Sequence, residues 1–365
     1  MGDVANRFDN LRVPVTANLR KNGNTPYYGA NGIQDFVDGY THDGEYILVA
    51  EDGANNLKNY PINYVSGRIW VNNHAHVLQA IPDLANTRFL GYEIGRSNIV
   101  SLLVGGGRAK LNADALMNMS INLPKMQEQE LIAKIFKTID HAITLHEEKK
   151  HQLDRLKSAL LQKIFVDKSS YPAVRFVGFK NAWEQCKLGD VCEVYDGIHQ
   201  TPDYQDHGIM FLSVENISTL TSNKFISREY FEQNFKIFPE RGDILLTRIG
   251  NVGTPNVVEK TDRLAYYVSL ALLKAPKIDS YFLCNLICTQ KFKKELHSKT
   301  LTTAIPQKIN KDEIRKVTFF NSTNCDEQKR IGLLLRTIHL SITLHDHKLE
   351  LLKRMKQSLL QKMFI

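Results

Sequence analysis

The sequence predicts an α+β protein: two mixed α/β domains separated by two long antiparallel coiled-coil helices, with an internal pseudo-twofold repeat. Three observations predict this fold: a 38-residue segment that occurs twice, a coiled-coil pattern in both copies, and unlike sequence ahead of each copy. The chain of 365 residues is long enough to bury a core in each domain. The predicted division is a domain over residues 1–124, a helix over 125–166, a domain over 167–324 and a helix over 325–365.

The duplicated segment is the strongest signal in the sequence. Residues 128–165 align without a gap on residues 327–364, and 18 of the 38 pairs are identical. The copies end alike, on Leu-Leu-Gln-Lys-Ile-Phe and Leu-Leu-Gln-Lys-Met-Phe. A weaker echo, Met1-Gly-Asp-Val and Leu188-Gly-Asp-Val, opens the two domains. This layout predicts one scaffold that carries two diverged domains, which do one kind of job on two different targets.

Both copies are predicted to be helical. Residues 126–165 contain neither Pro nor Gly, and Pro124 lies just before them. Apolar residues recur at a spacing of three and four, which is typical of a coiled-coil seam. In the first copy the seam residues are Ile132, Ile135, Ile139, Ala142, Leu153, Leu156 and Leu160. In the second copy they are Ile331, Leu334, Ile338, Ser341, Leu352, Met355 and Leu359.

Polar residues interrupt both seams at the same place. His146 and Lys149 take core positions in the first copy, and His345 and Lys348 take them in the second. If the helices pair with His146 and His345 at matched centres, the polar layers meet. A shifted register would bury polar groups against leucine, so these residues are predicted to set the register. The alternative is that they reach solvent at a loose place in an ordinary amphipathic helix.

Composition limits the class of protein. The net charge of +8 is compatible with a polyanion such as DNA, although many basic proteins bind no nucleic acid. The five cysteines are an odd number, and the first residues carry no apolar signal region. We therefore expect a cytoplasmic protein with reduced thiols. No run of residues is long and apolar enough to span a membrane, so no membrane partner is expected.

Catalytic motifs are missing from the sequence. No two prolines are adjacent, as the base-binding turn of an amino-methyltransferase would require, and no Gly-Lys pair marks a phosphate-binding loop. His146 and His151 are five residues apart, which does not place them on one helix face. His74 and His76 would share a strand face, but the sequence shows no third ligand. We expect no catalytic residue, no metal site and no cofactor of the chain's own.

Several motifs, in this order and together with the repeated helices, resemble the specificity subunit of type I restriction–modification systems. The first domain contains Thr25-Pro-Tyr-Tyr-Gly-Ala-Asn-Gly and Gly44-Glu-Tyr-Ile-Leu-Val-Ala-Glu-Asp-Gly. The second contains Trp183-Glu-Gln-Cys-Lys-Leu-Gly-Asp and Arg241-Gly-Asp-Ile-Leu-Leu-Thr-Arg-Ile-Gly. Family members usually carry the segment before Leu188 ahead of their first domain too. Here the chain begins at the Leu-Gly-Asp equivalent, which a shortened chain, a later start codon or a recombined gene would each explain.

The resemblance implies a function and a set of partners. Each target-recognition domain would read one half of a bipartite site on double-stranded DNA, and the helices would set the gap. Two modification subunits would bind the chain and methylate adenine with S-adenosylmethionine. Restriction subunits, where the system has them, would use ATP and Mg²⁺. The alternative is a non-catalytic adaptor whose two domains bind other macromolecules. Salt-sensitive affinity for DNA would separate the two.

Residues that contact DNA should be Arg, Lys, Asn, Gln or aromatic residues on loops, because base edges are read by directional donors and acceptors. The candidates in the first domain are Tyr27, Tyr28, Asn31, Arg108 and Lys110. Those in the second are Gln200, Thr201, Arg248, Asn251, Gln307 and Lys308. The two tyrosines could equally be core aromatics, Arg248 could be a strand-end surface charge, and Lys308 suits phosphate better than a base.

Overall fold

The computed structural model describes residues 1–57, 59–105, 109–166 and 169–364. Two compact units make up the chain: Met1–Glu147 with His347–Ile365 (unit 1), and Glu148–Asp346 (unit 2). Each unit therefore holds half of each long helix, α3 (Met126–Ile164) and α9 (Cys325–Met363). The cuts fall at positions 147 and 346, which are equivalent in the sequence repeat. The boundaries between the two units therefore lie at equivalent positions of the two repeats.

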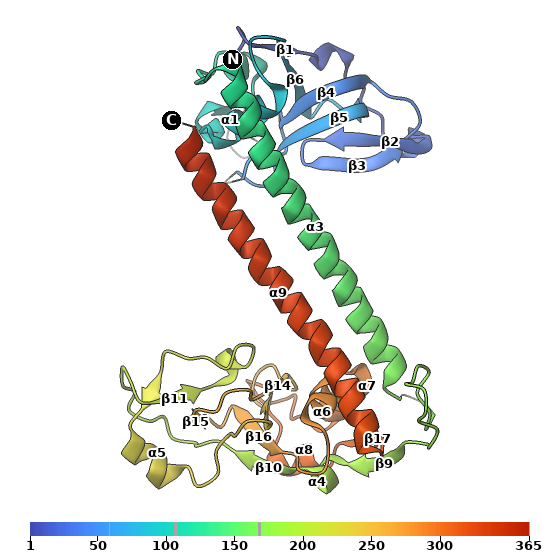
Figure 1. The fold of residues 1–365 in the computed structure, drawn as a ribbon, viewed down its shortest axis with the longest axis vertical. Coiled ribbons are helices and arrows are strands. Elements are labelled where there is room, and N and C mark those ends of the chain that lie inside the picture. Colours follow the sequence, from blue (N-terminus) through green and yellow to red (C-terminus); the bar gives the residue numbers. More distant parts are fainter. Residues whose placement is uncertain (58, 106–108, 167–168, 365) are drawn as a thin grey trace. The chain divides into compact units, whose positions relative to one another are not determined.

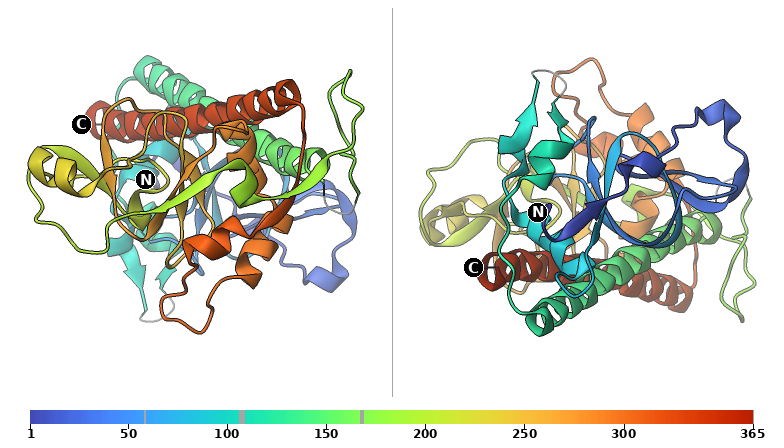
Figure 2. Two further views of the ribbon diagram at one scale, coloured as in Figure 1. Left: turned by 90° about the horizontal axis from the view of Figure 1, so that it is seen from below. Right: turned by 90° about the horizontal axis from the view of Figure 1, so that it is seen from above.

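The two long helices run antiparallel in both units, as the sequence predicts (Figures 1 and 2). In unit 1, Lys356 Nζ lies 2.6 Å from an oxygen of Asp140, and Lys353 Nζ lies 2.7 Å from an oxygen of Glu147. In unit 2, Lys150 Nζ lies 2.7 Å from an oxygen of Asp346. Residues successively nearer the C-terminus of α3 therefore contact residues successively nearer the N-terminus of α9, as in an antiparallel pair.

The seam between the helices differs from the predicted one at Ile135, Lys149, Leu156, Lys348 and Met355, which are exposed, while Ala142, Leu334 and Ser341 are half-buried as predicted. Ile135 and Leu156 are 41% and 46% exposed, and Lys149 and Lys348 are exposed as well. The buried and half-buried positions of α3 include Ile132, Phe136, Ile139, Ala142, Ile143, His146, Lys150, Leu153, Lys157, Leu160 and Ile164. Those of α9 include Ile331, Leu334, Leu335, Ile338, Ser341, Ile342, His345, Leu349, Leu352, Lys356, Leu359 and Met363. The assignment of Lys149 and Lys348 to the core was wrong.

Phe136 explains the rotated seam. Its ring is fully buried and packs against Tyr92 and Phe364, with ring centroids 4.9 and 5.8 Å away. Burying this aromatic side chain turns the neighbouring Ile135 outward. The sequence pattern could not separate the two seams, because both residues are apolar and both spacings are coiled-coil spacings.

The register also differs from the predicted one, in which His146 lies opposite His345. Lys356 with Asp140, Lys150 with Asp346, and Lys157 with His339 (Nζ to Nδ1, 3.5 Å) all pair residues whose numbers add to 496. His146 thus lies opposite position 350, and His345 opposite position 151. The prediction that the two polar layers meet was wrong. The lysines in the seam have partners across it, which lets them stay half-buried.

The first head, residues 1–124 in unit 1, is built on a six-stranded sheet in the order β1-β6-β4-β5-β2-β3. Only β2 and β5 pair in parallel. The strands are β1 (Ala5–Arg7), β2 (Asn22–Gly29), β3 (Gly32–Val37), β4 (His42–Ala50), β5 (Ile62–Val71), β6 (Ala75–Ala80), β7 (Leu103–Val104) and β8 (Lys110–Leu111). The helices are α1 (Thr87–Arg96) and α2 (Ala113–Met117), with 3-10 turns at Asp9–Leu11, Ala17–Leu19 and Ile99–Leu102.

The second head, residues 167–324 in unit 2, has a four-stranded sheet, β10-β16-β13-β14, and a three-stranded one, β12-β11-β15. The strands are β9 (Glu184–Lys187), β10 (Glu193–Asp196), β11 (Ile209–Leu212), β12 (Phe225–Ile226), β13 (Ile244–Thr247), β14 (Pro255–Val257), β15 (Leu264–Tyr266), β16 (Leu270–Lys274) and β17 (Thr318–Asn321). The helices are α4 (Leu188–Val191), α5 (Arg228–Asn234), α6 (Ser280–Ile287), α7 (Gln290–Ser298) and α8 (Lys311–Arg315), with a 3-10 turn at Val214–Asn216.

The same contacts join each head to the helices. In unit 1, Asn86 caps α1 and donates its backbone N–H to Gln129 on α3 (2.9 Å), while Phe364 from the end of α9 stacks on Phe89. In unit 2, Asp279 and Gln328 repeat the first contact, also at 2.9 Å. Phe165, the equivalent of Phe364, packs on Phe282 at 5.3 Å.

The final Phe of each repeat is therefore a core residue of the head at the C-terminal end of its own helix. No helix in the described part of the chain is both long enough and apolar enough to cross a membrane.

Candidate nucleic-acid interface

Three predicted residues of the second head lie on neighbouring loops. Asn251 is on the loop after β13, and Gln307 and Lys308 are on the loop before α8; all three are exposed. Gly250 donates its backbone N–H to the carbonyl of Gln307 (2.8 Å), and Ile249 forms a β-bridge with Lys308. Gln307, with its side-chain amide, and Lys308, with its ammonium group, thus lie on a loop next to the one that carries Asn251. Such a set can read a base edge and hold a phosphate.

The loop that carries Asn251 is held rigidly. Thr247 Oγ donates to the carbonyl of Asn251 (2.5 Å) and accepts from the N–H of Thr254 (2.9 Å). Gly253 has φ of +96°, and a Cβ added there would lie 2.8 Å from Leu296 Cδ2 of α7. Glycine is required here because the loop packs directly on α7. The Asn251 side chain is therefore presented from a fixed backbone.

Gln200 and Thr201 belong to the same edge of the four-stranded sheet. Both β10 and β13 run antiparallel to β16, so they end at the same edge. Gln200 and Thr201 follow β10 and are exposed, and Asn251 follows β13. The sequence could not show this, because the two loops are about 50 residues apart in the chain.

Arg248 is buried, so its assignment as a DNA-contacting residue was wrong. Its side chain is 6% exposed; Nε donates to the carbonyl of Ile309 (3.0 Å), and the guanidinium pairs with Asp196. These contacts tie the end of β10 to the loop before α8. Arg248 is a positioning residue for the loops that carry Gln200, Asn251 and Lys308.

The predicted DNA contacts of the first head are more buried, or more engaged in contacts within the protein, than the sequence suggested. Tyr27 is 1% exposed, and its hydroxyl is held between the N–H and the carbonyl of Val15 (2.9 and 3.2 Å), so it is a core residue and not a DNA contact. Tyr28 is half-buried, and burial raises the pKa of its hydroxyl. Asn31 is exposed, but its amide holds Gly53 and Asn55. Arg108 lies outside the described residues.

Lys110 takes part in an ion network that the sequence did not reveal. Its ammonium lies 2.8 Å from Glu51, which also accepts from Arg12 (2.6 Å). His76 is buried, with Nδ1 2.7 Å from Asp9 and Nε2 2.9 Å from the carbonyl of Leu111. Asp9, Glu51 and His76 stand close enough to hold a cation. Their acceptor oxygens already face Arg12, Lys110 and the N–H of Val77, so we interpret the cluster as an internal ion network.

The sequence analysis missed the basic face of α7. Lys293, Lys294 and His297 line a cavity of about 540 Å³ beside the Asn251 loop. The available signal was the run Lys-Phe-Lys-Lys at 291–294, in which the apolar residue belongs to a helical face that Leu296 continues.

Comparisons with known proteins give a consistent result. Residues 1–155 match the family model described as type I restriction modification DNA specificity domain. The chain is 34% identical over 257 residues to a Haemophilus influenzae protein named as a type I restriction enzyme specificity subunit, covering 69% of this chain and 65% of that protein. It is 23% identical over 292 residues to the MjaVIII specificity subunit of Methanocaldococcus jannaschii, covering 74% and 67%. The chain thus spans about two thirds of the length of these relatives.

The fold also matches a solved structure. The S subunit of a type I restriction–modification system from M. genitalium superposes with a TM-score of 0.75 at 12% identity, over 100% of this chain and 94% of that one. At this identity the likeness shows the fold alone.

Proposed function

Because the chain belongs to the family of type I restriction–modification specificity subunits, we propose that it selects the DNA sequence on which such a complex acts. Each head reads one half of a bipartite site on double-stranded DNA, and the paired helices set the gap. The chain itself is non-catalytic; S-adenosylmethionine, ATP and Mg²⁺ are bound by partner subunits. The complex works in the cytoplasm.

The observation that carries the proposal is one scaffold with two unlike heads. Both heads are joined to the helices by the same Gln and Phe contacts, although their sheets differ in strand number and order. In the second head, exposed Gln200, Thr201, Asn251, Gln307 and Lys308 lie on loops at one end of the sheet. Two half-sites of different sequence require two different DNA-contacting surfaces, and here two unlike heads are held by the same pair of helices.

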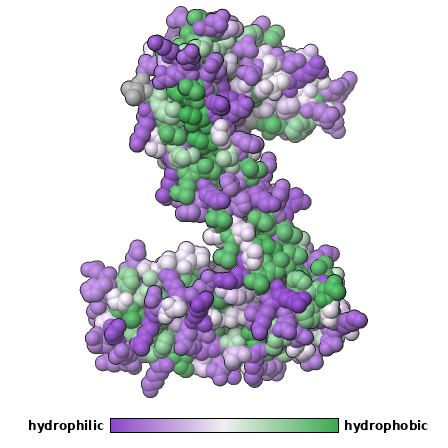
Figure 3. Space-filling model, in the orientation of Figure 1, coloured by the Kyte–Doolittle hydropathy of each residue, from purple (hydrophilic) through white to green (hydrophobic). Residues whose placement is uncertain are grey.

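The helices also offer a surface for two modification subunits. Besides the seam, each unit exposes a second set of large apolar side chains on the helices, and Figure 3 shows apolar surface over the helix pair in each unit. In unit 1 these residues are Leu131, Ile135, Leu145, Leu351 and Met355. In unit 2 they are Leu156, Leu333, Leu340 and Leu344. Exposed apolar patches of this kind mark protein–protein contacts.

Substitutions at Leu145 and Leu344 test the docking of modification subunits. The two residues are equivalent in the repeat and are 55% and 53% exposed. We expect native mass spectrometry to show two modification subunits on the wild-type chain, one on Leu145→Asp or Leu344→Asp, and none on the double variant. An exposed leucine can be replaced with little effect on folding, within about 0.5 kcal/mol. A wild-type 1:1 complex at saturating partner, or two partners on a single variant, would contradict the proposal.

The gap between half-sites tests the role of the helices. We insert one heptad between Lys150 and His151 and another between His345 and Asp346, because these positions face each other in the observed register. Seven residues lengthen a helix by ~10.5 Å and turn the seam by only about 20°. Along DNA this length matches about three base pairs, which also rotate the far half-site by roughly 100°. The heads cannot follow that rotation without strain.

We therefore expect unchanged half-sites, a different preferred gap and weaker methylation, measured by methylome sequencing of cells that carry the complex. An insertion in α3 alone is the control, and it should abolish methylation by breaking the register. An unchanged gap at full efficiency would show that the helices do not set the spacing. The competing function, an adaptor for other macromolecules, predicts no salt-sensitive affinity for DNA even with modification subunits present.

A further inference from the structure

Helix α7 of the second head is amphipathic, with an apolar inner face and a basic outer face. Phe292 and Leu296, four residues apart, are both 1% exposed and belong to the core of unit 2. Lys293 and Lys294 lie between them in sequence and are exposed. Burial of the two apolar side chains fixes the rotation of the helix, so the lysines face outward.

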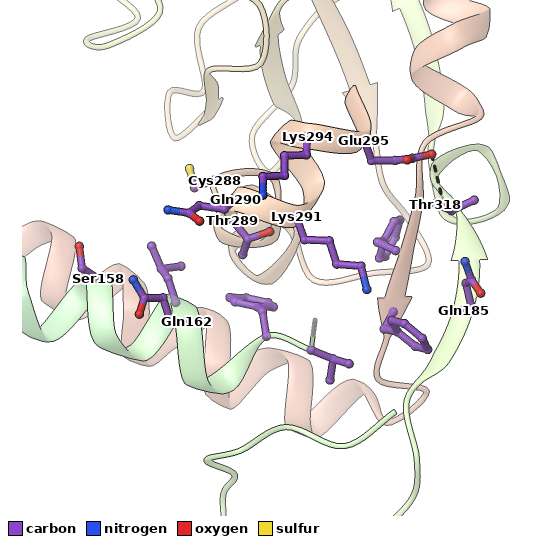
Figure 4. Close-up of a pocket in the computed structure, with 15 residues that line it drawn as sticks. Ser158, Gln162, Gln185, Cys288, Thr289, Gln290, Lys291, Lys294, Glu295 and Thr318 are labelled. Carbon is purple, nitrogen blue, oxygen red and sulfur yellow. Dashed lines mark hydrogen bonds between the residues drawn. The ribbon is translucent and has the colours of Figure 1, made fainter. Parts of the chain in front are cut away.

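Within the described residues, neither of these two lysines forms an ion pair with a carboxylate. Lys299 forms an ion pair with Glu295 (3.2 Å), and the ammonium of Lys291 lies over the ring of Phe320, 4.7 Å from its centroid. Across the part of the chain that the structure describes, no carboxylate oxygen comes within 4 Å of the ammonium of Lys293 or Lys294. Figure 4 shows Glu295 turned toward Thr318, to which it is hydrogen-bonded at 3.4 Å, and away from Lys294.

The basic face adjoins the loop that carries Asn251. A cavity of about 540 Å³ lies between them, lined by the loop residues 251–254 and by Lys293, Lys294, His297 and Ser298. Because Gly253 packs directly on Leu296, the distance between the loop and the helix is fixed. The lysines therefore keep a constant position relative to the loop that reads the base.

We propose that Lys293 and Lys294 bind the phosphodiester backbone of DNA beside the base pairs that the Asn251 loop reads. Contacts to phosphate fix the orientation of a reading surface on the duplex, and contacts to base edges supply the sequence. Two exposed lysine ammonium groups next to an exposed amide provide both kinds of contact on one rigid surface. This inference rests on the proposed function and adds the phosphate-binding residues, which lie outside the loops predicted from the sequence.

The test is the salt dependence of DNA binding by the full chain assembled with its modification subunits. The probe is a duplex that carries the methylated site, and affinity is measured by fluorescence anisotropy between about 50 and 200 mM KCl. Each phosphate contact contributes about 0.9 to the slope of log affinity against log salt. We expect Lys293→Ala/Lys294→Ala to lower that slope by about 1.8 and the affinity by about tenfold or more, with the preferred half-sites unchanged.

Two further variants make the test specific. Lys180→Ala/Lys187→Ala removes the same charge from exposed positions of unit 2 that do not line the cavity, and it should keep the slope. Lys293→Arg/Lys294→Arg keeps the charge and should also keep the slope. An unchanged slope in the alanine variant, an equal loss in the control, or a loss in the arginine variant would overturn the inference.

The failure of this inference can be told from that of the proposed function. If the alanine variant instead binds modification subunits more weakly while its DNA slope is unchanged, α7 is a protein contact and the inference is overturned alone. If the wild-type complex shows no sequence-dependent binding, the proposed function is wrong and the inference is overturned with it.

Discussion

Replacing Phe364 with alanine is expected to destabilise unit 1 by about 3 to 5 kcal/mol, the range measured for large aromatic truncations in protein cores. Phe364 is 7% exposed and stacks on Phe89, with ring centroids 5.1 Å apart. It also packs on Phe136 at 5.8 Å. A single aromatic residue at the end of a long helix would look dispensable from the sequence alone. Its burial in the core of the first head predicts the opposite.

Urea unfolding of the purified chain measures this loss, and hydrogen exchange followed by mass spectrometry assigns it to a unit. Exchange should accelerate in α1 and the first half of α3, which contain Phe89 and Phe136. Leu351→Ala is the matched control, since Leu351 is on the same helix and 50% exposed. A loss below about 1 kcal/mol for Phe364→Ala, or one equal to that of the control, would mean that the repeat's final Phe does not anchor the helix.

Replacing Glu327 with alanine is expected to cost unit 2 about 3 to 5 kcal/mol, because the guanidinium of Arg175, only 14% exposed, loses its counter-charge. Glu327 is fully buried and accepts two hydrogen bonds from the guanidinium of Arg175, at 2.5 and 2.8 Å. It also accepts from Trp183 Nε1 at 3.1 Å and from Ser322 Oγ at 2.5 Å. The variant removes the acceptor of all four bonds.

The repeat supplies the control for this experiment. Glu128 is the equivalent of Glu327 in the first copy, and it is exposed. Glu128→Ala should therefore change the free energy of unfolding by no more than about 0.5 kcal/mol. Equal effects of the two substitutions in urea unfolding would contradict the assignment.

The Glu327 network should also depend on pH. Burial raises the pKa of Glu327, but the hydrogen bonds from Arg175, Ser322 and Trp183 together hold that pKa below its ordinary value. A carboxylate with a lowered folded-state pKa stabilises the fold above its unfolded pKa and loses that contribution as pH falls. The difference in free energy of unfolding between wild type and Glu327→Ala should be full at neutral pH and shrink below about pH 4.

The long helices were predictable because their signal is local and repeated. The predicted spans 125–166 and 325–365 enclose the observed helices Met126–Ile164 and Cys325–Met363. The seam was predicted only in part, since Ile135 and Phe136 are both apolar and only tertiary packing determines which of them is buried. The register depends on charge pairs such as Lys150 with Asp346. The two members of such a pair belong to different helices, so no local sequence pattern reveals them.

The heads were predictable where strands are continuous apolar runs. The apolar runs at 45–50, 208–214 and 243–248 predict strands, and β4, β11 and β13 lie there. The apolar run at 98–104 also predicts a strand, and this prediction is wrong: residues 99–102 form a 3-10 turn and only Leu103–Val104 are extended. Ile99 of this turn is buried, while Val100 and Val104 are 46% and 48% exposed. An apolar run alone does not distinguish a turn from a strand.

Residue type alone did not predict which of the candidate DNA contacts are buried. Asn251 and Lys308 follow the expected loop chemistry and are exposed, whereas Arg248 and Tyr27 are buried through partners distant in sequence, Asp196 and Val15. An arginine at a strand end and a tyrosine in a turn look alike in sequence whether they face a ligand or the core.

Exchange of the first head tests the central claim most directly. Residues 1–124 are replaced with the corresponding head of another family member, and the methylome of cells that carry the complex is sequenced. The account predicts that one half of the methylated site changes while the other half and the gap stay the same, because the second head and the helices are untouched. A change in both halves, or in neither, would contradict the claim that each head reads its own half-site.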